Sequence, residues 1–238
     1  MAVESIAFPP AAHVGGAESA QVFDGQSAAR AGDALYAAAK RAIDLLVAVT
    51  LLIALLPVFA VICLAIRLDS GGPIFYRAER IGRFGRSFSV AKFRSMRAGA
   101  DQTPHIRFIQ SLMRDDATPC DLYKVTADDR ITRVGRWLRR TSLDELPQLW
   151  NIVRGDMSLV GPRPDVPYAV REYNTDTAQR LQVRPGITGL WQVSGRSRLS
   201  LKDMYRLDVD YARRASLWLD LEILLRTVPV VLGHEGAA

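Results

Sequence analysis

The sequence has 238 residues, a length that suits one domain or a small domain with an appendage. Its formal net charge of +6 favours anionic partners such as nucleic acid, anionic lipid head groups or phosphorylated small molecules. The two cysteines, Cys63 and Cys120, form no CxxC motif and the three histidines are scattered, which argues against a zinc or redox site.

The two ends of the chain are predicted to be tails. Residues 1–34 are rich in Ala, Gly, Pro and Ser and show no clean periodicity, so we expect a disordered segment. No basic start leads directly into a short apolar core, so this segment does not look like a signal peptide. Residues 233–238 are assigned to a short C-terminal tail.

The strongest physical signal is an apolar run over residues 42–66, which Lys40 and Arg41 precede. As a straight helix its 25 residues would be about 37 Å long, enough to cross a hydrocarbon core of about 30 Å. Helices of soluble proteins seldom stay apolar on every face for this length, so a membrane helix is favoured over a buried core helix. We assign residues 35–67 to it.

Two features favour a helix that enters the membrane and returns. Pro57 lies at the middle of the run, where it removes a backbone hydrogen bond and kinks a helix. Basic residues flank both ends, which places both ends on the cytoplasmic side. A full crossing stays open as the less favoured alternative.

Residues 73–80 and 86–93 are predicted to form two short strands around a turn with Gly82 and Gly85. Seven basic residues lie between positions 77 and 97. A solvated charged hairpin and a surface for lipid phosphates remain equal interpretations. The polar residues 98–127 carry no recognisable chemistry, although a short helix around 105–114 is plausible.

The segment 128–164 contains the candidate chemistry. Leu146, Leu149, Trp150 and Val153 follow the spacing of an amphipathic helix. Ser142 would be its N-cap and Glu145 the third helical residue of a capping box, although Pro147 favours a start one or two residues later. In either register Asp144 and Glu145 lie in the first turn.

Backbone N–H groups and the helix dipole stabilise negative charge in a first turn, so we expect Asp144 to be ionised at neutral pH. An ionised carboxylate can act as a nucleophile or bind magnesium. Taken alone, acids at this position are more often simple helix caps.

The surrounding basic residues favour a catalytic role of the acidic pair over simple helix capping. Several arginines surround the acidic pair in the sequence, and Arg163 follows in a rigid Gly-Pro-Arg-Pro turn. A guanidinium held between prolines can make a paired contact with phosphate oxygens. The alternative for Arg163 is a salt bridge that braces the loop. Carboxylates and arginines beside a membrane suggest a phosphorylated substrate handled through a divalent cation.

These residues resemble a known family. TSLDELPQLWNIVRGDMSLVGPRP (141–164) and RPGITGLWQVSGR (184–196) are similar to the bacterial sugar transferases, the monotopic phosphoglycosyl transferases. The similarity extends to KRAIDLLVA, the hairpin, KFRSM at 92–96 and the stretch 207–227, and covers roughly residues 38–232. Some members have a small polar residue before the mid-helix proline, where this chain has Leu56.

The resemblance implies a two-step reaction. Asp144 would attack the phosphate attached to the sugar of a UDP-sugar and release a nucleoside monophosphate. Undecaprenyl phosphate would then attack the acyl phosphate on Asp144. Glu145 would assist in binding Mg²⁺ (or Mn²⁺) or in handling a proton, and Asp144 and Glu145 are the expected metal ligands.

The resemblance also implies the remaining site residues. Arg139 and Arg163 match arginines that bind phosphates, Arg184 is a candidate wall of the nucleotide site, and Lys92 is a further candidate for substrate binding. The implied product is the first lipid-linked intermediate of an exopolysaccharide or another surface glycan. The sugar is not determined.

Downstream of the acidic pair, residues 165–182 and 200–213 look helical, and RPGITGLWQVSG (184–195) between them is expected to be irregular. The sequence therefore predicts a mostly helical α+β protein, with a re-entrant membrane helix, a small β-hairpin and a helical catalytic domain over residues 68–232. We expect it at the bacterial inner membrane with the catalytic domain on the cytoplasmic face. The expected partners are a UDP-sugar, undecaprenyl phosphate and membrane lipids but no nucleic acid, and a homodimer is left open. The alternatives are a non-catalytic membrane scaffold and a phosphohydrolase.

Overall fold

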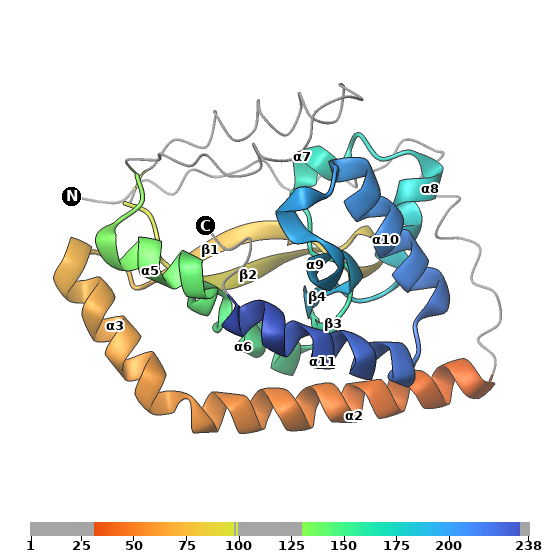
Figure 1. Cartoon of the computed structure of the whole chain (residues 1–238), viewed down its shortest axis with the longest axis horizontal. Helices are drawn as coiled ribbons and strands as arrows, with labels where there is room; N and C mark the ends of the chain where they lie inside the picture. Colours follow the sequence, from red (N-terminus) through yellow and green to blue (C-terminus); the bar gives the residue numbers. More distant parts are fainter. Residues whose placement is uncertain (1–30, 98, 100–129, 234–238) are drawn as a thin grey trace.

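The computed structural model describes residues 31–97, 99 and 130–233 (Figure 1). The described chain is mostly helical with two small two-stranded sheets, which confirms the predicted mostly helical α+β class. The interpretations of residues 1–30, of the helix around 105–114 and of the last five residues fall outside this part of the chain.

Two helices, α2 (Ala31–Ala54) and α3 (Leu56–Ser70), form the apolar segment and extend it beyond residues 35–67. They meet at an angle of 60°, and Pro57 lies in the first turn of α3, where its missing N–H costs least. Among the described residues, no single helix has the length and apolarity to cross a bilayer, whereas this bent pair meets both criteria together.

Polar side chains of α2 bind it to the rest of the protein. Lys40 forms an ion pair of 2.7 Å with Asp220 of α11 (Leu217–Leu232). Both terminal nitrogens of Arg41 donate to the last carbonyls of α6 (Gln148–Arg154). Asp44 is buried and accepts hydrogen bonds from the Ser158 hydroxyl and the Leu159 N–H, at 3.1 and 3.0 Å. The charges near the start of the apolar segment therefore face protein.

The far end of α3 is fixed to the same body. The Asp69 carboxylate accepts from the Val134 N–H in the first turn of α5 (Arg133–Thr141). Arg94 donates to the Ser70 hydroxyl and to the Gly71 carbonyl. Between these contacts lies a small apolar core made by Ile62, Ile66, Phe93 and Leu138. Both ends of the bent pair therefore rest on one side, against one domain.

The predicted hairpin is confirmed. Strands β1 (Phe75–Ile81) and β2 (Ser87–Phe93) pair antiparallel around a 3₁₀ turn over Arg83–Gly85. Its basic residues do not form one solvated face, because Lys92 and Arg94 turn inward and bind protein groups.

A second sheet was not predicted. Strands β3 (Ser158–Val160) and β4 (Gly186–Thr188) pair in parallel, and β4 lies in the stretch expected to be irregular. A Cβ atom on Gly186 would lie 2.1 Å from the backbone nitrogen of Gly161, so this approach requires glycine. Three-residue strands give too little alternation to be recognised in a sequence.

The rest of the domain is helical. Residues 165–182 form short helical pieces: α7 (Pro167–Val170), α8 (Thr175–Ala178) and a 3₁₀ turn over Gln179–Gln182. Helix α9 spans Leu190–Ser194, a 3₁₀ turn spans Arg196–Arg198, and α10 (Leu201–Arg214) confirms the helix expected over 200–213.

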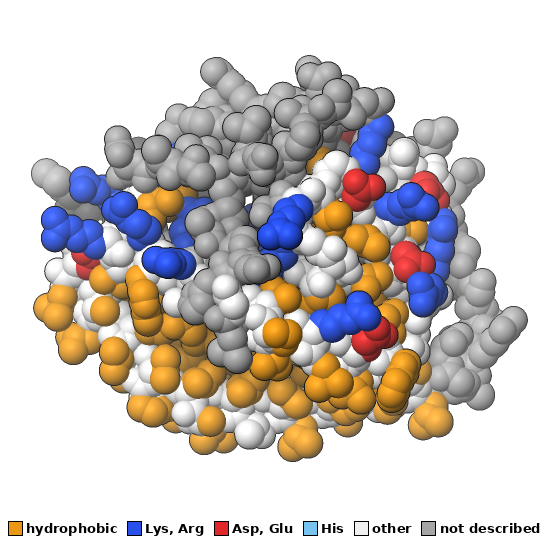
Figure 2. All heavy atoms as spheres, viewed as in Figure 1, with side chains coloured by type: hydrophobic (Ala, Val, Ile, Leu, Met, Phe, Trp, Pro, Cys, Tyr) orange, Lys and Arg blue, Asp and Glu red, His pale blue; other side chains and the backbone are white. Residues whose placement is uncertain are grey.

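One edge of the molecule is covered by apolar side chains (Figure 2). It is formed by α2, α3 and α11, which lie along the same edge in Figure 1. Helix α11 has two apolar faces, since Leu219 and Ile223 are buried while Trp218 is 76% exposed. The exposed side chains of this apolar edge include Leu46, Ile53, Leu56, Val61, Leu64, Leu68, Trp218, Leu225 and Val228.

Candidate functional site

The acidic pair lies in a 3₁₀ turn between two helices. This turn spans Leu143–Glu145 and precedes α6. The prediction that Ser142 caps a helix N-terminus was wrong. Ser142 instead ends α5 in a left-handed conformation (φ 59°), and its backbone N–H donates to carbonyls of that helix. Pro147 sets the start of α6 because it is tolerated before the first hydrogen-bonded turn.

Helix α6 attaches the pair to the hairpin through a buried amide. The Asn151 side chain accepts from the Ala91 N–H at 3.1 Å and donates to the Ser89 carbonyl at 2.8 Å, so it pairs with the open edge of β2. Trp150, predicted on the buried face, is 56% exposed. The helix turns a polar residue inward because β2 offers it two backbone partners.

Glu145 is held between two cations. The Lys92 ammonium lies 2.7 Å from its Oε1, and the two terminal nitrogens of Arg163 lie 2.6 Å from Oε1 and 3.3 Å from Oε2. The Glu145 side chain is 15% exposed. The structure thus brings together three predicted site residues from β2, the 3₁₀ turn and the loop after β3.

The two neighbouring carboxyl groups have opposite electrostatics. Burial by itself would raise the pKa of Glu145, but Arg163 and Lys92 outweigh it and hold that pKa well below its ordinary value. Burial raises the pKa of Asp144, and the negative charge of Glu145 adds to the rise. Lys92, Arg163 and Arg139 oppose the rise.

The physical reason given for the ionisation of Asp144 therefore needs a correction. The expectation relied on a helix N-terminus, whereas Asp144 lies in a short 3₁₀ turn and is 9% exposed. Within the described residues its carboxyl group has no hydrogen bond or ion pair, in contrast to Glu145. A buried carboxylate without such partners is a stronger base and a less hydrated nucleophile than an exposed one.

Arg163 reaches Glu145 from a fixed turn. Gly186 N–H donates to the Pro162 carbonyl at 2.9 Å, which joins the start of the turn to β4. The Arg163 side chain is 38% exposed while it pairs with Glu145. The predicted bracing salt bridge is present, and phosphate binding by Arg163 stays a proposal.

Arg184 lies elsewhere. Its Nε donates to the Gly155 carbonyl, at the C-terminal end of α6, whereas Asp144 precedes the N-terminal end of this helix. A helix of seven residues is about 10 Å long. The structure therefore does not bring Arg184 to the acidic pair.

Arg196 was not predicted as a site residue. Burial lowers the pKa of its guanidinium, while the charge of Glu145 raises that pKa and the charge of Arg163 lowers it. Its Nε donates to the Gln192 carbonyl at 3.3 Å. It has a left-handed backbone (φ 50°) directly after Gly195. Its place at the end of the RPGITGLWQVSGR stretch was the available signal, but the fold that returns it to Glu145 is not local.

The acidic pair can be compared with what magnesium requires. In the described part of the chain no group of three or more His, Cys, Asp or Glu side chains could hold a metal ion. Magnesium is commonly held by one or two carboxylates together with substrate phosphates and water. Asp144 fits that role directly, and Glu145 fits it after exchanging one of its cationic partners.

The sequence of this chain is similar to a known family and to several known proteins. The bacterial sugar transferase family model matches residues 35–234. The UDP-galactose-lipid carrier transferase of Erwinia amylovora is 43% identical over 202 residues, 83% of this chain and 41% of that protein. The exopolysaccharide production protein ExoY of Sinorhizobium fredii is 40% identical over 202 residues, 83% of this chain and 87% of that protein.

A third relative points the same way. The undecaprenyl-phosphate glucose phosphotransferase of Komagataeibacter xylinus is 41% identical over 202 residues, 79% of this chain and 35% of that protein. The chain thus spans less than half the length of the Erwinia and Komagataeibacter proteins and most of the length of ExoY. The match over residues 35–234 shows that the chain belongs to the bacterial sugar transferase family.

Proposed function

We propose that this protein transfers a sugar 1-phosphate from a UDP-sugar to undecaprenyl phosphate, the first step of an exopolysaccharide or another surface glycan. The observation that carries the proposal is the placement of Asp144 beside Glu145, which Lys92 and Arg163 hold as a carboxylate. The names of the relatives support the donor and the lipid acceptor, and their naming of both galactose and glucose leaves the sugar open.

The first step is an attack by a carboxylate oxygen of Asp144 on the phosphorus that carries the sugar. A bond forms between this oxygen and phosphorus, the bond to the bridging oxygen of the diphosphate breaks, and UMP leaves with the electron pair. A covalent intermediate divides one difficult displacement into two easier ones. Arg163, paired with Glu145, and Arg139, whose charge lowers the pKa of Asp144, would offset the negative charge of the transferring group.

In the second step a phosphate oxygen of undecaprenyl phosphate attacks the same phosphorus. The bond to Asp144 breaks, and the Asp144 carboxylate is regenerated. Glu145 stays charged throughout, and its ion pairs with Lys92 and Arg163 position both cations before the metal binds. A magnesium ion held by Asp144, Glu145 and the donor phosphates would supply additional neutralisation of phosphate charge.

The apolar edge supports a membrane location, and the bent pair supports a re-entrant helix. The start of α2 and the end of α3 both contact the same domain, through Lys40 to Asp220 and through Asp69 to Val134. A helix that crossed the bilayer would separate these ends by about 30 Å of hydrocarbon. The arrangement therefore favours entry and return on the cytoplasmic face of the inner membrane.

The test incubates the purified protein with Mg²⁺ and each of several labelled UDP-sugars, first without and then with undecaprenyl phosphate. We expect a protein-bound phosphosugar with the donor alone and its transfer to lipid when the acceptor is added. Asp144→Asn should lose both products, while Asp176→Asn, a change in an exposed ion pair, should keep them.

The labelled products of this assay distinguish a transferase from a phosphohydrolase and from a membrane scaffold. Labelled free sugar phosphate without labelled lipid would indicate a phosphohydrolase. An absence of turnover with every donor would indicate a membrane scaffold. Unchanged turnover by Asp144→Asn would overturn the covalent mechanism and leave the transfer itself to another nucleophile.

A further inference from the structure

The turn that carries Arg163 is held at three carbonyl groups. The Pro162 carbonyl accepts from Gly186 of β4, the Arg163 carbonyl accepts from Arg180 at 2.8 Å, and the Asp165 carbonyl accepts from Ile81 of β1 at 2.9 Å. The first and third contacts are backbone bonds that the neighbouring strands supply. The second, at the residue that binds Glu145, depends on a single side chain.

That side chain is the centre of a buried polar cluster. Arg180 is 3% exposed, and its Nε and one terminal nitrogen donate to Asp208 Oδ2, the former at 3.1 Å. Its other terminal nitrogen donates to the Tyr173 hydroxyl and lies 3.6 Å from Asp165 Oδ2. The guanidinium also lies over the ring of Tyr205, 4.8 Å from its centroid.

The same cluster fixes the residue after the second proline. Asp165 Oδ2 accepts from the hydroxyls of Tyr173 and Tyr205 at 2.9 and 2.6 Å, and Oδ1 accepts from the Val166 N–H. Arg180 and the two tyrosines therefore hold both sides of Pro164, through the carbonyl before it and the carboxylate after it.

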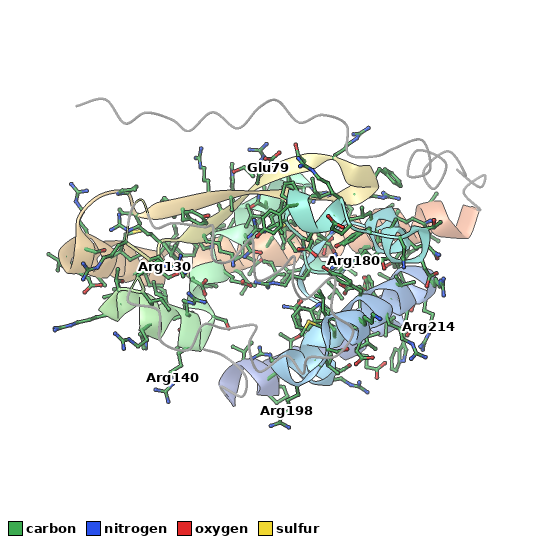
Figure 3. All side chains as sticks on the ribbon, turned by 90° about the horizontal axis from the view of Figure 1, so that it is seen from above. Glu79, Arg130, Arg140, Arg180, Arg198 and Arg214 are labelled. Carbon is green, nitrogen blue, oxygen red and sulfur yellow. The ribbon has the colours of Figure 1, made fainter. Side chains whose placement is uncertain are left out.

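Stability alone is a weak reason for this cluster. A buried ion pair often contributes no more than an apolar pair of the same volume, because both charges lose their water. Asp208 Oδ1 is also buried without a hydrogen-bond partner among the described residues. Figure 3 shows Arg180 inside the domain, while Arg140, Arg198 and Arg214 point outward. What the cluster supplies is a fixed position.

We propose that Arg180, supported by Asp208, Tyr173 and Tyr205, is a positioning residue that orients Arg163 toward Glu145 and the transferring phosphate. This inference rests on the proposed function for its kinetic consequence. A bidentate contact depends on the direction of the guanidinium plane, and a displacement of about 1 Å at such a group can cost on the order of a hundredfold in rate.

Two conservative variants test the proposal without emptying the core. Tyr205→Phe removes one hydroxyl from Asp165, and Arg180→Lys keeps the charge but cannot reach Asp208 and the Arg163 carbonyl together. Tyr36→Phe is the matched control, because its hydroxyl also donates to a carboxylate, that of Asp220. Arg214→Lys is the control for the arginine, in an exposed pair with Asp210.

The decisive measurement is a double-mutant cycle on kcat/KM for the UDP-sugar, with Arg163→Ala as the second change. We expect Tyr205→Phe to lower kcat/KM about fivefold and Arg180→Lys about thirtyfold when Arg163 is present. In the Arg163→Ala background both effects should fall below about twofold, because no guanidinium is left to orient. The controls should change kcat/KM less than about twofold in either background.

Equal losses in both backgrounds would overturn the proposal, because they would indicate a general structural effect. A second readout does not need turnover: hydrogen exchange of the backbone amides in residues 161–166, compared between Tyr205→Phe and Tyr36→Phe. Faster exchange in Tyr205→Phe alone is expected, and equal exchange would also overturn the proposal. A wild-type protein without transferase activity would sink the proposed function, while the exchange comparison would still decide the role of Arg180.

Discussion

The apolar edge and the acidic site reverse the usual distribution of side chains. On α2, α3 and α11, leucines and a tryptophan are more than half exposed, as for Leu68 at 78% and Trp218 at 76%. At the site, Glu145, Lys92 and Asp208 are largely buried. In water alone, the first arrangement exposes apolar area and the second removes charge from solvent, and both are unfavourable.

The difference shows where each region obtains its favourable energy. The site offsets the cost of burying the Glu145 carboxylate by giving it two cationic partners. The apolar edge has no internal partner among the described residues and fits the lipid surface of the proposed function. A substitution that disturbs one of the two regions should therefore leave the other region intact.

The largest effect is expected at Glu145. Glu145→Gln leaves Lys92 and Arg163 close together without a balancing charge, so the free energy of unfolding should fall by about 3 kcal/mol and transfer should fall by at least about a hundredfold. Denaturant unfolding in detergent and the lipid-labelling assay measure both. Asp176→Asn, in an exposed pair, should change the unfolding free energy by less than about 0.5 kcal/mol. Equal effects of the two changes would contradict the assignment of Glu145.

The next effect is expected on the apolar edge. Leu64→Lys places a charge on an exposed position of α3, which should weaken membrane association by about 2–3 kcal/mol. Flotation with vesicles measures the bound fraction, and the unfolding free energy of the domain should stay unchanged. Thr175→Lys, on α8 away from this edge, is the control for added charge. Retention of Leu64→Lys on vesicles would argue against lipid contact at α3.

A smaller effect is expected where α2 of the bent pair contacts the rest of the domain. Asp44→Ala leaves the Ser158 hydroxyl and the Leu159 N–H buried without their acceptor, so the unfolding free energy should fall by about 1–3 kcal/mol. Asp44→Asn should cost less, because Asp44 accepts both bonds through one oxygen, which an amide keeps. Thermal unfolding of the two variants compares them, and a larger loss for Asp44→Asn would show that the charge itself is needed.

The smallest effect concerns the ionisation of Asp144. Burial raises its pKa, so the carboxyl group stays protonated to higher pH and the rate of adduct formation should fall on the acid side at a higher pH than for an exposed aspartate. Arg139 opposes this rise, so Arg139→Gln should move the midpoint of the profile upward. A pH profile of adduct formation with donor alone measures it, and a downward movement would contradict the placement of Arg139.

Features of the fold were predictable from the sequence where they depend on residues that lie close together in the chain. The hairpin follows from two alternating runs around glycines, and the bend of the apolar segment follows from Pro57. The acidic pair was found because Asp144 and Glu145 are adjacent in the chain. The parallel sheet of β3 and β4 was missed because each strand has three residues.

Errors in the site also have physical causes. Ser142 matched a capping box, but the chain reverses there in a left-handed conformation and the hydroxyl does not cap the next helix. Arg184 was chosen from a motif as a wall of the nucleotide site; it lies at the C-terminal end of α6, away from the acidic pair, and its nucleotide role stays a prediction. Arg180 carried no local signal for its contact with the catalytic turn, since Arg163 and Asp208 lie 17 and 28 residues away from it in the sequence.

The sequence by itself determined the bent apolar segment, the hairpin and the acidic pair, because proline geometry, alternation and adjacency act over a few residues. The tertiary structure decided which cations meet Glu145, which end of α6 Arg184 reaches, and that both ends of the bent pair rest on one domain. These outcomes depend on contacts between residues far apart in the chain, and such contacts form after local structure has been packed into one core.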